Sequence, residues 1–180
     1  GRRDPDGSDA ALLGDLLAQL PDEPRVLDVG PCDGARTLAN LPEGTLGVDI
    51  SRAALDLAAE TAPGAEPLQG EMRALPIADG SVDAVTAYHA VFHVPRDEQP
   101  GVYREFARVL RAGGRLLMTL PGGRFQTVRR GWMGGEMFFS APGRERTFDQ
   151  LREAGFGELR TETATDPLGS STEFVFGTLS

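Results

Sequence analysis

The chain has 180 residues, of which 40% are hydrophobic and 25% are charged. This balance is that of an ordinary globular protein, and the length predicts a single domain with a substantial core. Its 27 acidic residues against 18 basic residues give a net charge of −9. Because such an acidic surface repels phosphate backbones, we expect no general binding to nucleic acid.

The cysteine and arginine content bears on the cellular setting. Cys32 is the one cysteine, so no disulfide can form within the chain, and we expect a reducing, cytoplasmic setting. No apolar run reaches the roughly 20 residues of a membrane-spanning helix, so no membrane span is expected. Every basic residue is arginine, which together with abundant Ala, Gly and Pro favours a bacterial source with a GC-rich genome.

Hydrophobic periodicity and turn residues predict an alternation of helices and strands in the first half of the chain. Leucines at 12, 13, 16, 17 and 20 share one helical face, and Pro21 follows them. The run from Arg25 ends at a Gly-Pro break and reads as a buried strand. The expected elements are a loose N-terminus over 1–8, helix 9–20, strand 25–30, helix 35–40, strand 44–50, a helix capped by Ser51 that continues to 61, and an edge strand over 66–70.

The second half continues the alternation and then closes with two strands. Its expected elements are strand 82–88, helix 97–111 ended by glycines 113 and 114, strand 115–120, a long connecting loop over 121–143, helix 144–154, and strands 157–164 and 172–179. No helix separates the last two strands, so we expect them to pair antiparallel through a turn at 166–169. The pattern predicts an α/β domain over 1–180, with a doubly wound, mainly parallel sheet covered on both faces.

The exit of the first strand carries the clearest chemical signal. Ligands of open α/β sheets bind beyond the carboxyl ends of the strands, where the strand order reverses. There Gly30 and Gly34 permit a tight loop, and Asp49 ends the next strand. A carboxylate at that place can accept hydrogen bonds from both ribose hydroxyls, which predicts a nucleoside-containing ligand. The alternative is a glycine turn beside a surface aspartate.

A nicotinamide dinucleotide fits this loop poorly. The loop lacks the spacing G-x-G-x-x-G, because Cys32 stands at the middle position and Ala35 follows Gly34. Asp28 and Asp33 would also oppose a pyrophosphate, whereas they suit a cationic or zwitterionic ligand. A nicotinamide oxidoreductase is therefore the least favoured of the functional hypotheses considered for this chain.

Four stretches in order carry a family resemblance: VLDVGPCDG at 26–34, GVDI at 47–50, GEMRALPIADGSVDAV at 70–85 and REFARVLRAGGRLLM at 104–118. Together they resemble class I S-adenosylmethionine-dependent methyltransferases of the small-molecule, ubiquinone-biosynthesis-like type. The resemblance implies a Rossmann-like, seven-stranded mixed sheet with six parallel strands and one antiparallel strand. It implies S-adenosylmethionine as cofactor, S-adenosylhomocysteine as product, and a small-molecule acceptor with an O, N or C nucleophile.

The resemblance also assigns roles to residues in these motifs. It implies that Asp28 and the backbone of Gly30 hold the methionine ammonium, with Gly34 in the same cofactor-binding loop. Asp49 would bind the ribose diol. The remaining roles are Ile50 on the adenine face, Glu71 and Met72 at the adenine edge, and Tyr88 with His89 at the methionine end.

Acceptor-side residues come from two later segments. His89 and His93, the two histidines, follow strand 82–88, and either can act as a base at neutral pH. For His93, the alternative is a bond to loop backbone that shapes the pocket. Trp132, Met133 and Phe138 lie in the long connection, which we expect to be an acceptor lid or a homodimer contact.

Further alternatives concern charge, metal and activity. Three arginines in the long connection, Arg124, Arg129 and Arg130, would attract an anionic acceptor or form a solvated basic turn. No cluster has metal-ligand spacing, so no metal is expected. Cys32, which we expect to be buried, replaces the family's middle glycine and would crowd the cofactor. Only about 24 residues precede the first strand, whereas many members of the family carry a longer N-terminal helical segment that covers the pocket. These departures motivate the second hypothesis, a non-enzymatic binding or assembly module.

Overall fold

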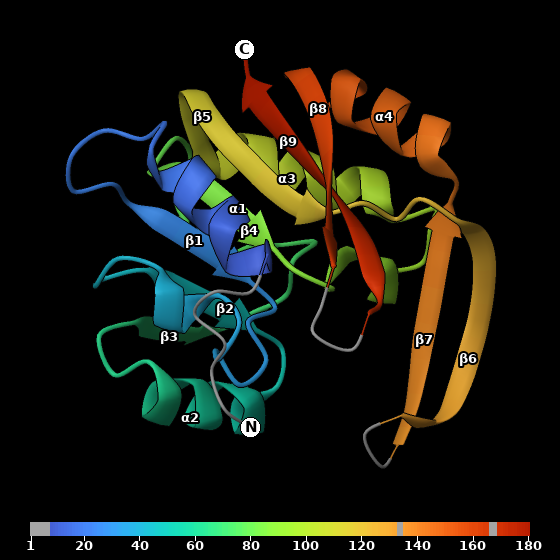
Figure 1. The fold of residues 1–180 in the computed structure, drawn as a ribbon, viewed down its shortest axis with the longest axis horizontal. Helices are drawn as coiled ribbons and strands as arrows, with labels where there is room; N and C mark the ends of the chain where they lie inside the picture. The colour runs from blue at the N-terminus through green and yellow to red at the C-terminus, as the bar shows by residue number, and fades with distance from the viewer. Residues whose placement is uncertain (1–7, 133–134, 166–168) are drawn as a thin grey trace.

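A computed structural model describes residues 8–132, 135–165 and 169–180 (Figure 1). Its elements are α1 (Ser8–Leu17), β1 (Val26–Val29), the 3₁₀ turn η1 (Leu38–Asn40), β2 (Leu46–Asp49), α2 (Arg52–Thr61), β3 (Glu66–Gln69), β4 (Val82–Ala87), the 3₁₀ turn η2 (Val91–His93), α3 (Gln99–Val109), β5 (Leu110–Thr119), β6 (Arg124–Trp132), β7 (Gly135–Pro142), α4 (Arg144–Glu153), β8 (Phe156–Thr165) and β9 (Ser171–Leu179). In these ranges no helix is long and apolar enough to span a membrane.

The main sheet has seven strands in the order β3-β2-β1-β4-β5-β9-β8. The pairs among β3, β2, β1, β4 and β5 are parallel, and β9 runs antiparallel to both β5 and β8. Six strands therefore share one direction and one is reversed, which confirms the expected sheet. Strand order reverses at β1, because β2 and β3 extend to one side and β4 and β5 to the other. That reversal is where a ligand is expected.

Helices cover both faces of the sheet, as expected (Figure 1). On one face, Leu13 and Leu16 of α1 pack with Leu117 and Phe174 of the sheet. The other face is covered by α3 and α4, and Phe106 is fully buried there. Each such side chain contributes roughly 1.5–3 kcal/mol through the hydrophobic effect. The edge strand β3 includes Pro67, which lacks a backbone N–H and is tolerated at an edge.

Two expected boundaries are wrong. The helix expected over 35–40 is reduced to the single turn η1, because a segment that short cannot sustain an α-helix and the Thr37 hydroxyl donates to Asp28. Helix α3 ends at Val109, before the two glycines that were expected to end it. Instead Gly113 and Gly114 lie in β5, where a bulge occupies the stretch between the Val82–Leu110 and Ala84–Arg115 pairs. The left-handed φ of +77° at Gly113 makes that bulge possible.

The connection over 121–143 is a β-hairpin, which corrects the expected loop. Strands β6 and β7 form a separate two-stranded antiparallel sheet that stands apart from the main sheet (Figure 1). Its β-branched and aromatic residues, such as Val128 and Phe139, favour extended pairing. At its root the rings of Phe139 and Phe92 stack with centroids 5.5 Å apart. Residues 133–134, residues 166–168 of the turn expected at 166–169, and most of the N-terminal segment over 1–8 lie outside the described residues.

Gly34 and Gly44 offer a matched test of how the first loop packs. Both have a left-handed φ, +75° and +79°, but only at Gly34 would an added Cβ meet other atoms, namely Ala58 Cα and Cβ at 3.3 Å. We expect Gly44→Ala to lower the free energy of unfolding by about 1 kcal/mol. Gly34→Ala should lower it by about 2–4 kcal/mol, because overpacking against α2 is added. Urea denaturation measures both, and equal losses would contradict close packing of the loop on α2.

Candidate functional site

A cavity of about 400 Å³ opens at the carboxyl ends of β1, β2 and β4. Its volume is typical of small-molecule and cofactor pockets. The lining comes from four segments and the hairpin: Val29, Gly30, Cys32, Val48, Asp49, Ile50, Ser51, Ala54, Gly70, Glu71, Met72, Arg73, His89, Ala90, His93, Val94, Pro95 and Met137. The cavity therefore lies where the strand order reverses.

Seven of the residues singled out from the sequence line this cavity: Gly30, Asp49, Ile50, Glu71, Met72, His89 and His93. Asp28, Gly34, Tyr88 and Phe138 do not. The side chain of Trp132 and the whole of Met133 lie outside the described residues.

Asp49 is held in place at the end of β2 by two backbone N–H groups. Its Oδ1 accepts from the N–H of Ser51 at 2.9 Å, and its Oδ2 accepts from the N–H of Cys32 at 3.4 Å. A carboxylate has about four acceptor positions. Asp49 therefore keeps acceptor capacity at the cavity wall, where hydroxyl groups of a ligand can donate to it.

The glycine-rich loop is shaped by left-handed residues. Gly30 has a φ of +67°, and a Cβ there would lie 2.9 Å from Ala90 Cβ. Cys32 has a φ of +54° and is exposed, which corrects the expectation that it is buried. Cys32 lines the cavity, and its N–H donates to Asp49 Oδ2. Partial desolvation of the sulfur, together with nearby carboxylates, raises the pKa of the Cys32 thiol, so the thiol stays protonated at neutral pH.

Asp28, which the resemblance assigns to the methionine ammonium, is buried and does not line the cavity. Its carboxylate is fully buried, with Oδ1 accepting from the hydroxyl of Thr86 at 2.8 Å and Oδ2 accepting from the hydroxyl of Thr37. Desolvation by burial raises the pKa of Asp28 to about 7. Asp28 therefore ties β1 to β4 and to the loop before η1.

Two other sequence-derived assignments belong to packing. Gly34 lies against Ala58 of α2, so its missing side chain serves the approach of helix and loop. Tyr88 is buried in the core beside α1, with its ring centroid 4.7 Å from that of Phe174. Neither residue lines the cavity.

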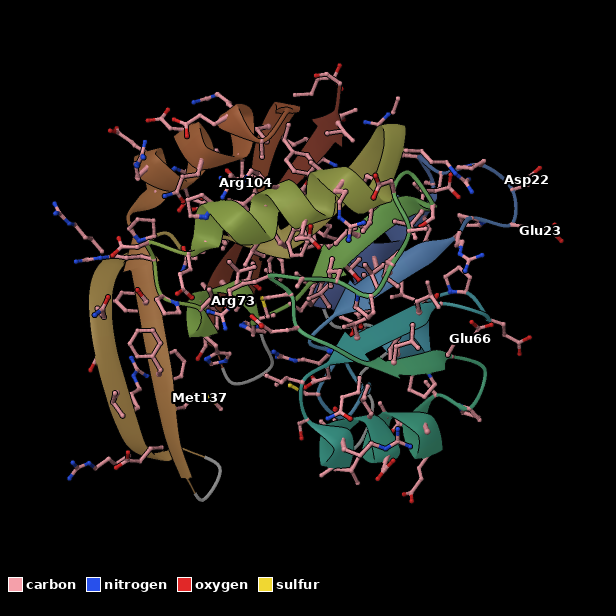
Figure 2. The ribbon with its side chains drawn as sticks, turned by 180° about the vertical axis from the view of Figure 1, so that it is seen from behind. Asp22, Glu23, Glu66, Arg73, Arg104 and Met137 are labelled. Atoms are coloured by element: carbon pink, nitrogen blue, oxygen red, sulfur yellow. The ribbon has the colours of Figure 1, made fainter. Side chains whose placement is uncertain are left out.

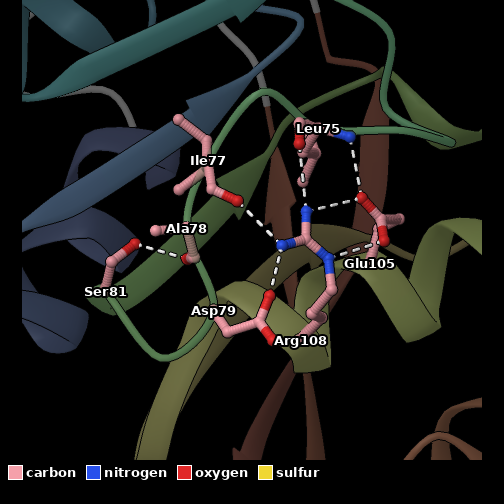
Figure 3. Close-up of polar contacts among 7 residues, drawn as sticks. All are labelled: Leu75, Ile77, Ala78, Asp79, Ser81, Glu105 and Arg108. Carbon is pink, nitrogen blue, oxygen red and sulfur yellow. Dashed lines mark hydrogen bonds and ion pairs between the residues drawn. The ribbon is translucent and has the colours of Figure 1, made fainter.

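The segment after β3 is fixed by Arg108, a partly exposed arginine of α3 (Figure 3). Arg108 donates to the carbonyl oxygens of Leu75 and Ile77 at 3.0 and 2.8 Å, and it pairs with Glu105 and Asp79. The hydrogen bond from Arg108 lowers the pKa of the Glu105 carboxyl, which also accepts from the N–H of Leu75. This network holds the backbone that carries the cavity residues just before it.

Arg73, which sequence reasoning missed, lies on the rim of the cavity. Figure 2 labels Arg73. Its guanidinium pairs with both Glu71 and Glu98. These pairs connect the segment after β3 to the start of α3. Only proximity in the fold could find this residue, because Glu98 lies 25 positions further along the chain.

His93 is oriented by the hairpin. Its Nδ1 lies 2.9 Å from the carbonyl oxygen of Phe138. A carbonyl only accepts, so Nδ1 carries the proton, and in the neutral ring Nε2 is left as a hydrogen-bond acceptor. The N–H of His89 donates to Thr119 Oγ1 at 2.9 Å. The tautomer of the His93 ring is set by its bond to the hairpin.

The hairpin root and η2 form one hydrogen-bonded unit around Gln99. The buried Gln99 amide donates from Nε2 to the carbonyl oxygens of Val94 at 3.0 Å and Ser140 at 2.9 Å. The hydroxyl of Ser140 in turn accepts from the N–H of Arg96 at 3.0 Å. Met137 of β7 reaches the cavity from this unit (Figure 2). The hairpin therefore supplies part of the cavity wall.

Residues 27–118 match the family described as "Methyltransferase domain". The chain belongs to this methyltransferase family. It is similar to the biotin biosynthesis bifunctional protein BioHC of Cellvibrio japonicus, with 35% identity over 127 residues that cover 68% of this chain and 25% of that protein. It is also similar to the malonyl-[acyl-carrier protein] O-methyltransferase of Methylococcus capsulatus, with 31% identity over 166 residues that cover 86% and 60%. The methyltransferase chain thus spans less than two thirds of either relative.

Solved structures agree with this assignment at the level of the fold. An S-adenosylmethionine-dependent methyltransferase of Methanosarcina mazei superposes with a TM-score of 0.76 at 20% identity, covering 92% of this chain and 96% of that chain. The S-adenosylmethionine-bound amino pentose methyltransferase CalS10 of Micromonospora echinaspora gives 0.71 at 22%, covering 97% and 91%. The chain therefore has the fold of these S-adenosylmethionine-dependent methyltransferases. The carboxylate of Asp49, the apolar wall and the absent side chain at Gly30 would fit S-adenosylmethionine.

The buried Asp28 carboxyl predicts a pH dependence of stability. Its folded pKa of about 7 lies above its ordinary value of 3.8, so the fold favours the protonated acid. Stability from this group is therefore complete below about pH 4 and falls as the pH rises to about 7, by no more than roughly 4 kcal/mol. In Asp28→Asn this decline should be absent. Urea denaturation between pH 4 and 8 measures the decline, and Asp56→Asn, at an exposed position, is the control. Parallel curves of unfolding free energy against pH for the wild type and Asp28→Asn would contradict the raised pKa of Asp28.

Proposed function

We propose that this chain transfers the methyl group of S-adenosylmethionine to a small-molecule acceptor. The observation that carries the proposal is one cavity whose lining includes both Asp49 and the loop at Gly30 and also His93 and Met137. The first pair suits a nucleoside-containing cofactor, and the second pair suits an acceptor.

On the cofactor side, Asp49 accepts from the two ribose hydroxyls. Val48, Ile50 and Ala54 offer apolar contacts to the adenine, and Glu71 with Met72 lies at its edge. Gly30 lets backbone and ligand approach without a Cβ between them. Asp28 acts through the loop as a positioning residue, since both of its oxygens are already bonded.

On the acceptor side, the chain holds the nucleophile of the acceptor in line with the methyl group and can take the proton of that nucleophile. The sulfonium of the cofactor supplies an activated methyl group with a good leaving group. Alignment of the two reactants can contribute roughly 7–11 kcal/mol. His93 presents Nε2 as the base for an acceptor that must lose a proton, with a contribution of about 10²–10⁴-fold. His89 is the second candidate for this role.

The hairpin forms the acceptor wall in this proposal. Met137 contributes a side chain, whereas Phe138 contributes the carbonyl that orients His93. Trp132 and Met133 stay predictions as lid residues. A homodimer and a cytoplasmic setting stay predictions as well.

The acceptor class is left broad by the relatives. Their names describe an O-methyltransferase of malonyl-[acyl-carrier protein] and a methyltransferase of an amino pentose. These acceptors present a carboxylate and a sugar, respectively. We therefore propose an oxygen, nitrogen or carbon nucleophile on a small molecule or on a small group attached to a carrier.

Asp49→Ala tests the cofactor site directly. Loss of two charge-assisted hydrogen bonds should weaken S-adenosylmethionine by about 10²-fold or more, because each contributes roughly 1.5–3 kcal/mol. Calorimetric titration of the folded variant measures this, with Asp56→Ala on α2 as a matched exposed control. Retained micromolar affinity in Asp49→Ala would contradict the ribose assignment.

The same titration separates methyl transfer from the non-enzymatic alternative. Micromolar binding of S-adenosylmethionine and S-adenosylhomocysteine by the wild type supports the proposed function. Affinity weaker than millimolar, together with a stable oligomer, would favour the binding or assembly module. Cys32→Gly then shows whether the side chain in the glycine loop is the cause.

A further inference from the structure

A second cavity, of about 590 Å³, lies at the root of the hairpin, between the starts of α3 and α4. It shares no lining residue with the cofactor cavity. The two are neighbours along the chain, because His93 and Pro95 line the first and Arg96 lines the second. The lining residues of the second cavity are Arg96, Asp97, Pro100, Arg124, Pro142, Arg146 and Gln150.

The lining contains three arginines and one aspartate, so it is locally basic, although the chain as a whole carries a net charge of −9. Within the described ranges, the side chains of Arg96 and Arg124 have no carboxylate partner. Arg146 pairs with Glu153 at 3.6 Å, and both of those side chains are more than half exposed. Such an exposed pair is weak and can open for another anion.

The backbone of these arginines is held by the fold. The N–H of Arg96 donates to Ser140 Oγ, and Arg124 pairs in register with Pro142. Gly143, with a φ of +102°, turns the chain from β7 into α4 beside Arg124, where an added Cβ would lie 3.8 Å from Arg124 Cβ. The cavity is therefore built on the anchored root of the hairpin.

Two helix starts border the same space. Pro100 lies in the first turn of α3 and Arg146 in the first turn of α4. The residues that precede these helices, Glu98 and Gly143, make no side-chain capping bond. At α4 the first N–H groups and the helix dipole attract anions. At α3 Pro100 has no N–H, and the N–H groups of Gln99 and Gly101 donate to the carbonyl oxygens of Pro95 and Glu98.

Gln150 gives an independent sign that a ligand completes this site. It lies one turn after Arg146 on α4, is 5% exposed, and its Oε1 has no hydrogen-bond partner. Buried amides are almost always hydrogen-bonded. Rotation of the amide exchanges its oxygen and nitrogen, so Gln150 can donate to an anion in the cavity.

We propose that this cavity binds the phosphate groups of a small phosphorylated molecule. The planar forks of arginine match phosphate oxygens in pairs. The volume lies in the range of small-molecule pockets, and the concave shape suits a compact ligand. This site is distinct from the methyl-transfer cavity, and its occupation does not depend on that reaction.

Calorimetric titration of the full chain with pyrophosphate at low ionic strength tests the proposal. We expect Arg96→Gln and Arg124→Gln each to weaken pyrophosphate binding about tenfold or more, since each removes a charged hydrogen-bond donor. Arg130→Gln is the matched control, because Arg130 lies on β6 like Arg124, is exposed and does not line the cavity. Its affinity should stay within about twofold of wild type.

Two comparison ligands define the chemistry. Inorganic phosphate that binds as tightly as pyrophosphate assigns the site to a phosphomonoester, whereas tenfold tighter pyrophosphate assigns it to a diphosphate. Citrate should bind more weakly than either. No pyrophosphate binding at millimolar concentration, an equal loss in Arg130→Gln, or citrate binding as tight as pyrophosphate would overturn the proposal. None of these readouts requires S-adenosylmethionine, so a failure here is distinct from a failure of methyl transfer.

Discussion

The site depends on one close approach, at Gly30. Its N–H donates to the carbonyl of Val48 at 2.8 Å, so the exit of β1 is bonded to β2. On its other side, a Cβ would lie 2.9 Å from Ala90 Cβ, in the segment after β4. Three strand ends therefore meet at a residue without a side chain. A larger residue would push the strand ends apart at the point where the strand order reverses and the cavity opens.

The hairpin extends this arrangement to the acceptor side. Because His93 Nδ1 is bonded to the carbonyl of Phe138, the tautomer of the ring is set by the hairpin. Gln99 donates to Val91 of η2 and to Ser140 of β7, so it bonds the histidine-bearing turn to the hairpin root. Chemistry at Nε2 is thus linked to a segment that lies outside the main sheet. The same root carries the arginine-lined cavity.

Much of the sheet could be predicted because its signals are local. Apolar runs mark β1, β2 and β4, and Asp49 ends one of them, so its place at the cavity follows from the strand. Asp28 shows the limit, since its partner Thr86 lies 58 residues away and only the fold reveals that its oxygens are occupied. The hairpin escaped prediction because its glycines read as a loop. Arg96 and Arg146 lie 50 positions apart, and no local pattern joins them.

A crystal structure with S-adenosylhomocysteine would show directly whether this cavity is the methyl-transfer site. We expect both ribose hydroxyls within hydrogen-bond distance of the Asp49 carboxylate, and the sulfur on the side of the cavity formed by His93 and Met137. The adenosine would lie against Ile50 and Ala54. A nucleoside bound elsewhere, with no contact to Asp49, would contradict the assignment of this cavity as the methyl-transfer site.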